Sequence, residues 1–208
     1  MTRDKLVIFG GAFDPPTMAH YFIMCYLQAQ PDIQEIVVIP SFRHVYGKEM
    51  SPFGRRVGWL DSIKPRTTHS GLPHVVVSEL EKWLSERPEG FSGLSCDLVE
   101  WIAQQDGFPK DKLLFVIGAD NAKEIEDRMW EGSDKLLSLC NLVVMGRGNY
   151  TSATFSHHPW YDRGADVSRT SSTHVRGCAK SNDLLGVQTL VHPGIVDSVM
   201  EQWGGRSE

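Results

Sequence analysis

The sequence has few of the features that mark several large classes of protein. Its four cysteines, Cys25, Cys96, Cys140 and Cys178, contain no C-x-x-C pair, so we expect neither a disulfide framework nor a structural zinc site. Its longest apolar runs are far below membrane-spanning length, and the run near the N-terminus is too short for a signal peptide. Internal repeats and low-complexity tracts are also missing. Together these absences predict a soluble, cytoplasmic protein with reduced thiols.

Positive charge is also scarce. The chain has 21 Lys and Arg residues against 26 Asp and Glu residues, so its formal net charge is -5 and its pI is near 5.9. Because such a chain carries no overall basic field, we expect neither nucleic acid nor a membrane as a partner. A local cationic pocket for nucleotide phosphates remains compatible with this balance. The sequence leaves the oligomeric state open, a homo-oligomer included.

The length and composition are those of an ordinary folded domain. Hydrophobic residues make up 41% and charged residues 23% of the 208 positions, which predicts a substantial core. Residues 85–93, with a proline and two glycines, are expected to form a loop. Residues 148–164 lack periodicity, and we interpret them as a loop on the substrate side. We predict a single domain over residues 1–208, with a small C-terminal helical cap over about residues 172–208.

Short apolar runs alternate along the chain with segments of helical character. The strand candidates are Leu6–Phe9, Glu35–Ile39, His74–Val77, Leu113–Ile117 and Leu142–Met145. The helix candidates are Met18–Gln30, Pro52–Ile63, Asp97–Gln105 and Ala122–Leu137. Continuous apolar strands of this kind are typical of parallel sheets that are covered on both faces. We therefore predict an α/β fold, a doubly wound, Rossmann-like parallel sheet with helices on both faces.

The first candidate site follows the first strand. Two glycines, Gly10 and Gly11, would let the backbone approach a ligand closely and adopt unusual dihedral angles. After two prolines, Thr17 is a natural N-cap for a helix whose start would attract phosphate. His20 comes three residues later, on the same face of the first turn. By themselves these residues are also compatible with a plain strand–turn–helix with a surface histidine.

A second candidate site lies near the other end of the chain. Ser171, Ser172 and Thr173 precede a short helix, and their hydroxyls can cap it. Arg176 falls in its first turns, where a guanidinium can grip a phosphate through two parallel hydrogen bonds. Alone, this pattern is equally compatible with ordinary capping and a solvated arginine.

Taken together, the two patterns resemble the signatures of the nucleotidyltransferase superfamily that contains the class I aminoacyl-tRNA synthetases. The string from Gly10 to His20 is similar to its [HT]-x-G-H element, and Ser171 to Arg176 is similar to its S-S-T-x-x-R element. Gly118, Asp120 and Trp130 resemble the G-A-D…W segment of the nicotinamide/nicotinate mononucleotide adenylyltransferases. Most bacterial members have His where this chain has Thr17. Members with threonine at this position also occur.

This resemblance implies a role for each matching residue. It implies that His20, Thr17 and Arg176 are catalytic and act on the ATP phosphates. It implies nucleotide binding by Gly10, Gly11, Ala12, Phe13, Gly118, Asp120, Ser171, Ser172 and Thr173. It implies binding of the pyridine mononucleotide by Lys48, Ser95, Trp130 and Arg147, with Arg55 or Arg56 as the family's downstream arginine.

The implied reaction joins ATP and nicotinate or nicotinamide mononucleotide into the dinucleotide, with release of pyrophosphate. ATP would be the co-substrate and would carry Mg²⁺, and we expect no metal site of the protein's own, with Asp14 as a water-mediated exception. The sequence is also compatible with two alternative functions. One is a pantetheine-phosphate adenylyltransferase or a cytidylyltransferase of the same fold. The other is a nucleotide-binding regulator without turnover.

Overall fold

The computed structural model describes residues 3–67, 71–147, 149–168 and 170–205 of the chain. The strands are β1 (Lys5–Gly11), β2 (Ile33–Pro40), β3 (His74–Val77), β4 (Leu113–Gly118), β5 (Asn141–Gly146) and β6 (Tyr161–Asp166). The α-helices are α1 (Met18–Gln28), α2 (Phe53–Ile63), α3 (Leu80–Ser85), α4 (Ser95–Asp106), α5 (Ala119–Glu126), α6 (Ser133–Leu139), α7 (Ser172–Lys180), α8 (Leu184–Leu190) and α9 (Val196–Trp203). Short 3₁₀ helices are η1 (Lys110–Lys112), η2 (Ser152–Phe155) and η3 (Pro193–Ile195).

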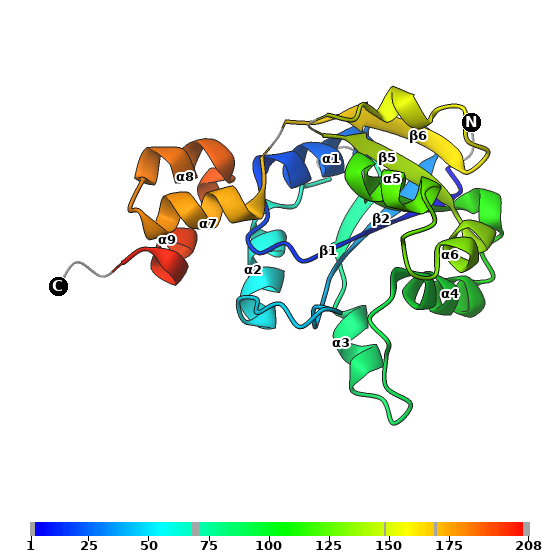
Figure 1. Ribbon diagram of the computed structural model, residues 1–208, viewed down its shortest axis with the longest axis horizontal. Helices are drawn as coiled ribbons and strands as arrows, with labels where there is room; N and C mark the ends of the chain where they lie inside the picture. Colours follow the sequence, from blue (N-terminus) through cyan, green and yellow to red (C-terminus); the bar gives the residue numbers. More distant parts are fainter. Residues whose placement is uncertain (1–2, 68–70, 148, 169, 206–208) are drawn as a thin grey trace.

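The six strands form one parallel sheet in the order β3-β2-β1-β4-β5-β6. Successive residues of β1 alternate between the two faces, as the pleat of a strand requires. Val7 and Phe9 pack in one hydrophobic cluster with α1, α2 and the C-terminal helices. Leu6 and Ile8 pack in the other cluster, with α3 to α6. The predicted doubly wound sheet with helices on both faces is therefore confirmed (Figure 1).

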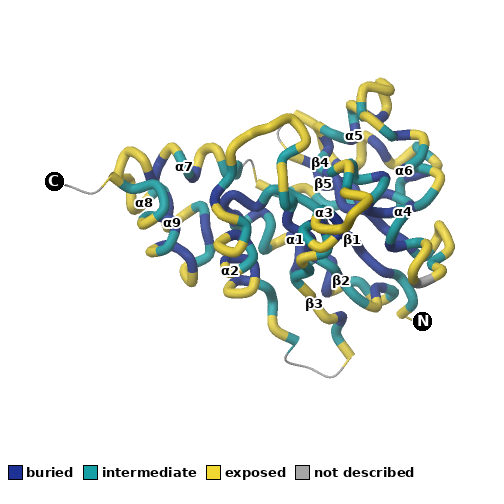
Figure 2. Tube along the Cα trace, turned by 90° about the horizontal axis from the view of Figure 1, so that it is seen from below, coloured by how far each residue is buried: buried dark blue, intermediate teal, exposed yellow. Residues whose placement is uncertain are grey.

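The core lies along the central strands. In Figure 2 the traces of β1, β4 and β5 run through the buried centre of the molecule, while exposed segments gather around it. The apolar side chains of β4 from Leu113 to Ile117 are all buried, which explains why this strand is a continuous apolar run. Within the described ranges, no helix combines the length and the hydropathy needed to cross a membrane.

Helices α7, α8 and α9 lie to one side of the sheet, next to α2 and the start of α1 (Figure 1). Val175 and Val199 of these helices are fully buried in the same cluster as Val7 of β1. The indole Nε1–H of Trp59 in α2 also donates to Ser198 Oγ in α9, over 2.9 Å. The C-terminal helical cap expected from about residue 172 is therefore present, while residues 206–208 lie outside the described ones.

Two sequence predictions of local structure are wrong, and two elements were missed. Residues 148–164 are not one loop, because η2 and most of β6 lie within them, and Gly148 is outside the described residues. Strand β6 lacks an apolar run because it is an edge strand whose side chains are only half-buried. The single helix expected over Ala122–Leu137 is divided into α5 and α6 by residues 127–132, of which Gly132, with a φ of +75°, directly precedes α6. Helix α3 was not predicted.

Candidate active site

A cavity of about 710 Å³ opens at the carboxyl ends of the central strands. Its walls include Gly10 and Gly11 at the end of β1 and Ile117 and Gly118 at the end of β4. These two strands are neighbours in the sheet, and the strand order reverses between them. In open α/β sheets a ligand binds in the crevice at this switch point. The fold therefore places the cavity where a nucleotide would be expected.

The cavity brings many of the predicted site residues together. Those that line it are Gly10, Gly11, His20, Lys48, Ser95, Gly118, Asp120, Trp130 and Arg147. The predicted residues outside its described lining are Ala12, Phe13, Thr17, Ser171, Ser172, Thr173 and Arg176. The lining does extend to Val167 and Thr170, directly before the second motif. None of the described residues between 149 and 166 lines it, so the expectation of a substrate-side loop there is also wrong.

The turn after β1 differs from the expectation in one respect. Gly10 and Gly11 continue β1 and pair with Ile39 and Pro40 of β2, so the unusual dihedral angle is not theirs. It belongs to Phe13, whose φ is +47° and whose side chain is buried. The aromatic edge of Phe13 lies 3.3 Å from where a Cβ on Gly11 would stand. Glycine at position 11 therefore leaves room for the buried ring.

His20 is held by the start of its own helix. Thr17 is the N-cap of α1, as predicted, and its backbone N–H donates to Nδ1 of His20 over 2.8 Å. The Thr17 hydroxyl lies 3.1 Å from the same nitrogen. Because Nδ1 accepts, the proton of the neutral ring is on Nε2, which becomes the donor available to a ligand.

His20 is neutral over a wide pH range. Burial and, to a smaller extent, the positive charge of Arg147 together lower its pKa to about 4. The ring also packs edge-on against the buried ring of Phe13, with 5.0 Å between the ring centroids. A neutral imidazole at this position can donate one hydrogen bond to an anion at pH 7 without carrying a charge of its own.

Arg147 forms an ion pair with Asp120 across the mouth of the cavity, with 2.9 Å between Nη2 and Oδ2. Asp120 lies in the first turn of α5, directly after β4, and Arg147 directly follows β5. Gly118 makes this arrangement possible, because a Cβ there would come within 2.4 Å of Asp120 Oδ1. Glycine at the end of β4 thus lets the Asp120 carboxylate fold back over the strand end.

The second motif contacts the turn of the first. Of the three hydroxyl residues expected before the helix, only Ser171 precedes α7 as its N-cap, and its hydroxyl accepts from the backbone N–H of His174, whereas Ser172 and Thr173 lie within the helix. The Ser172 hydroxyl donates to the carbonyl of Pro15 over 2.8 Å. Arg176 donates to the carbonyl of Asp14 over 2.6 Å and to Thr173 Oγ1 over 3.1 Å. Two motifs more than 150 residues apart in sequence therefore share one turn.

Trp130, Ser95 and Lys48 lie at another part of the lining. Trp130 is half-buried in the connection from α5 to α6, and Ser95 is the first residue of α4. Gly132 has a positive φ, and a Cβ on it would come within 2.4 Å of Cys96 Sγ. This close approach ties the Trp130 turn to the start of α4. Lys48 is exposed, in the connection between β2 and α2.

Sequence reasoning missed Glu81, a buried carboxyl in the cavity wall. Glu81 is only 6% exposed, and its Oε2 accepts from the backbone N–H of Phe42 over 2.9 Å. Burial raises its pKa to about 7, although the Phe42 hydrogen bond and the charge of Arg56 oppose the rise. The signal was weak, because helix α3, which carries Glu81, has only six residues.

Arg55 and Arg56 were the two candidates for the family's downstream arginine. Of these, Arg56 is the buried one. It is 1% exposed and donates from Nη1 to the carbonyl of Ala12 over 2.8 Å and from Nε to the carbonyl of Ser51 over 3.0 Å. Arg55 instead contacts Gln202 at the surface. Arg56 therefore holds the turn after β1 from inside the protein, and burial lowers its pKa.

This geometry can hold and align anions at one end of the cavity. A neutral Nε2–H donor on His20 and the cation of Arg147 stand near each other, and the start of α1 adds the positive end of its helix dipole. An aromatic ring and a hydroxyl stand elsewhere on the wall. Such a site can neutralise and orient phosphates without a nucleophilic side chain.

Comparisons with known proteins agree with this geometry. Residues 8–177 match the sequence profile of the family described as "Cytidylyltransferase-like". A protein of Myxococcus xanthus named "Probable nicotinate-nucleotide adenylyltransferase" is 24% identical over 83% of this chain and 80% of its own. A protein of Pseudothermotoga lettingae with the same name is 26% identical over 97% and 98%.

Solved structures show the same fold. The nicotinic acid mononucleotide adenylyltransferase of Plasmodium falciparum, in complex with NaAD, superposes with a TM-score of 0.73 at 19% identity, over 96% of each chain. A putative nicotinate-nucleotide adenylyltransferase of Vibrio parahaemolyticus gives a TM-score of 0.61 at 18% identity, over 97% of this chain and 93% of its own. The family profile covers the β1 turn, the cavity and the start of α7 together. The predicted nucleotidyltransferase resemblance is thus confirmed, and the chain belongs to the cytidylyltransferase-like family.

Proposed function

We propose that this chain is an adenylyltransferase that joins ATP to nicotinate or nicotinamide mononucleotide and releases pyrophosphate. The product is the dinucleotide, deamido-NAD or NAD. The observation that carries the proposal is the cavity at the β1/β4 switch point, which His20, Arg147 and Trp130 line together. Curated relatives over most of the chain are named for the nicotinate reaction, which supports the same conclusion.

This reaction requires the protein mainly to position its two anionic substrates. The 5′-phosphate of the mononucleotide is already a competent nucleophile at neutral pH and attacks the α-phosphorus of ATP in line. The P–O bond to pyrophosphate breaks as the new P–O bond forms, and negative charge grows on the leaving group. Catalysis therefore consists of holding two anions together and stabilising that growing charge. No covalent intermediate on the protein is needed.

We assign the phosphate end to His20 and Arg147. The Nε2–H of neutral His20 would donate to a phosphate oxygen of ATP, and Thr17 would keep the ring in the required tautomer. Arg147 would exchange Asp120 for the 5′-phosphate of the pyridine mononucleotide, which leaves the Asp120 carboxylate free to accept from the adenosine side. Gly10, Gly11 and Gly118 would let the nucleotide lie close to the strand ends.

We assign Arg176 and the Ser171–Thr173 segment to the β- and γ-phosphates. Arg176 donates to the Asp14 carbonyl and to Thr173, and Thr170, which directly precedes this segment, lines the cavity. A bound triphosphate would draw the guanidinium away from Thr173. Ala12 and Phe13 would act through the shape of the turn that Arg56 supports.

We assign the pyridine ring to Trp130, with Ser95 and Lys48 near it. Stacking on an indole suits a flat, electron-poor heterocycle. The names of the relatives favour nicotinate mononucleotide as the substrate, and Lys48 and Arg43 in the lining would attract its carboxylate.

Mg²⁺ would arrive as part of the ATP substrate. Asp14 does not fit the role of a direct ligand, because its Oδ1 accepts from the backbone N–H of Ser51 and its side chain is buried beside Arg176. The ion would neutralise the triphosphate when bound. The single-domain organisation, a cytoplasmic location and the absence of nucleic-acid and membrane partners stay predictions.

The test is to incubate the chain with Mg-ATP and each mononucleotide and to measure dinucleotide and pyrophosphate. We expect both products, and His20→Ala should lower turnover by roughly 10²-fold or more, since a lost charge-stabilising donor costs a few kcal/mol. His74→Ala, at an exposed position on β3, is the matched control and should keep full turnover.

Other outcomes would identify the alternatives. Turnover with pantetheine phosphate, or with CTP and an alcohol phosphate, would replace the proposed substrates within the same family. Tight ATP binding without product from any of these partners would indicate a regulator that has lost turnover.

A further inference from the structure

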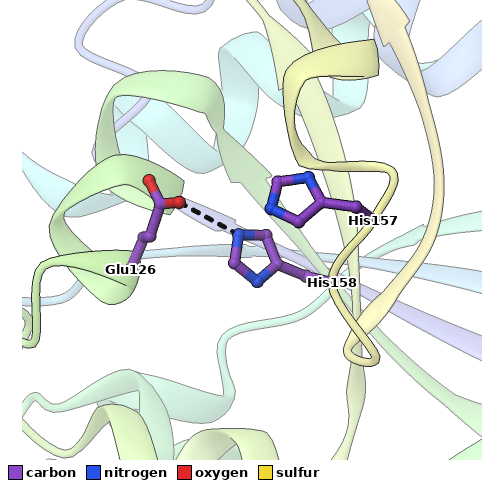
Figure 3. A group of neighbouring side chains, drawn as sticks. All are labelled: Glu126, His157 and His158. Atoms are coloured by element: carbon purple, nitrogen blue, oxygen red, sulfur yellow. Dashed lines mark hydrogen bonds and ion pairs between the residues drawn. The ribbon is translucent and has the colours of Figure 1, made fainter.

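A cluster of two histidines and a glutamate lies outside the cavity. Glu126 is the last residue of α5, and His157 and His158 lie in the connection from η2 to β6. One potential ligand atom from each residue lies within 4.8 Å of the other two. Figure 3 shows the Glu126 carboxylate and the two imidazole rings facing one another, with the contact from His158 Nε2 to Glu126 Oε1 drawn at 3.2 Å.

The ring of His158 is fixed by the core. It stacks on Trp160 with 4.4 Å between the centroids and an angle of 12°, and Trp160 is buried. The centroid of the His157 ring lies 4.1 Å from the centroid of the His158 ring, and the His157 side chain is exposed. One ligand is therefore pre-oriented by packing, while the second can turn toward it at little cost.

One carboxylate oxygen of Glu126, Oε1, is placed to bind an ion. The other oxygen, Oε2, accepts from Lys123 over 2.9 Å, and Lys123 also donates to Asp127 over 2.8 Å. Oε1 is the oxygen that faces His158. A cation between Oε1 and the two rings would therefore leave both Lys123 contacts in place, and Asp127 would offset the charge of Lys123.

We propose that Glu126, His157 and His158 form a binding site for zinc or a similar divalent transition ion. Two imidazoles and one carboxylate are a ligand set that such ions prefer, whereas Mg²⁺ and Ca²⁺ prefer oxygen ligands alone. Ligand bonds of about 2.0–2.1 Å place two tetrahedral ligands roughly 3.4 Å apart. The 3.2 Å contact already matches this spacing, and water would complete the coordination.

This site is separate from the proposed active site. Asp120 is in the first turn of α5 and Glu126 at its other end, so they are about 9 Å apart along the helix axis at 1.5 Å per residue. A bound ion would join α5 to the segment that leads into the edge strand β6. It would therefore stabilise the folded chain by an amount that rises with the logarithm of the ion concentration above the dissociation constant, because the unfolded chain does not hold the three groups together.

The experiment is a calorimetric titration of the full chain with ZnCl₂, together with thermal melting with and without the ion. Two variants test the ligands. Glu126→Gln keeps the size of the side chain and loses its charge, and His157→Ala removes an exposed ring. The matched control is His74→Ala, an exposed histidine on β3. Magnesium chloride tests the class of ion.

We expect one zinc ion per chain in the unaltered protein and in His74→Ala, with a rise in Tm. Both ligand variants should bind zinc at least tenfold more weakly, should lose the rise in Tm, and should keep the Tm measured without zinc. Equal zinc affinity in all variants would overturn the proposal, because the ion would then sit elsewhere. No zinc binding, or equal binding of magnesium, would overturn it as well.

Discussion

The backbone N–H of Thr17 donates to Nδ1 of His20 over 2.8 Å, and this single contact determines which ring nitrogen carries the proton. Helix capping and the proposed phosphate donor are therefore joined in one turn. The same bond that satisfies a free donor at the start of α1 leaves Nε2–H as the hydrogen-bond donor of a neutral ring. The resemblance links this position to phosphate binding, and the local geometry gives that link a physical basis.

The first prediction concerns the protonation of His20. Burial and Arg147 lower its pKa to about 4, so the free enzyme should hold His20 neutral down to that pH. Below pH 6.5 the unfolded chain takes up a proton there and the folded chain does not, so this histidine's contribution to stability is lost as the pH falls toward 4. NMR titration of the ring should give a midpoint near 4.

The matched variant for this measurement is Arg147→Gln, which removes the nearby positive charge. It should raise the midpoint only modestly, because burial is the larger cause of the shift. A midpoint near 6.5 in the unaltered protein would show that the ring is solvated and would remove the argument for a neutral donor.

The second prediction concerns Arg176. Arg176→Lys keeps the positive charge but loses the planar fork, so we expect a larger loss in kcat than in ATP affinity. Arg176→Ala should lower both kcat and the affinity for ATP. Steady-state kinetics with ATP varied, alongside calorimetric binding of a non-hydrolysable ATP analogue, measures the two effects separately.

Arg176 also holds the Asp14 turn, so thermal melting of both variants must accompany the kinetics. A loss of affinity with unchanged kcat would make Arg176 a binding residue only. Unchanged kinetics with a lowered Tm would reduce it to a structural link between α7 and the β1 turn.

The third prediction concerns Trp130. Trp130→Ala should weaken mononucleotide binding by about 1–3 kcal/mol, the range observed when a stacked ring is removed, and should change ATP binding much less. Calorimetry with each ligand alone would measure both effects. Trp83→Ala is a suitable control, because Trp83 is exposed and outside the cavity lining. A large fall in Tm for Trp130→Ala would instead assign the ring to the core.

The fourth prediction concerns Glu81, whose pKa is raised to about 7. Between pH 4.5 and 7 the folded chain holds a proton here that the unfolded chain has released, so stability from this group falls as the pH rises through that window. Glu81→Gln should remove this fall. We expect the free energy of unfolding of the unaltered protein, relative to Glu81→Gln, to drop by roughly 2–3 kcal/mol from pH 5 to pH 8.

Denaturant titrations at both pH values would measure this difference. Glu79→Gln, at an exposed position one residue before α3, is the control and should show no such trend. A difference between the unaltered protein and Glu81→Gln that stays constant with pH would show that Glu81 is ionised in the folded state throughout.

The features that the sequence predicted well are those with a local cause. Five strands were predicted from apolar runs, which are most continuous in the central strands β1, β4 and β5 because a strand covered on both faces needs apolar side chains at successive positions. Thr17 and Ser171 were recognised as N-caps because a short hydroxyl side chain before a helix satisfies its first donors. The two motifs, which contain these caps, were visible as strings of neighbouring residues.

What the sequence missed depends on packing between distant segments. Strand β6 has a polar sequence and is a strand because β5 offers it a hydrogen-bonding edge. Glu81 is buried because α3 is packed against the sheet, and the choice of Arg56 over Arg55 depends on which side of α2 faces the β1 turn. Neither fact has a signature within a few residues of sequence.

The sequence by itself determined five of the six strands, the caps and the two motifs, since short-range periodicity and hydrogen bonding encode these features. Only the tertiary structure decided that Ser172 and Arg176 contact the Pro15 and Asp14 turn, and that Glu126 faces His157 and His158. Burial, charge proximity and the resulting pKa values arise when segments far apart in the chain exclude water between them. No pattern of neighbouring residues in the sequence indicates where water will be excluded in this way.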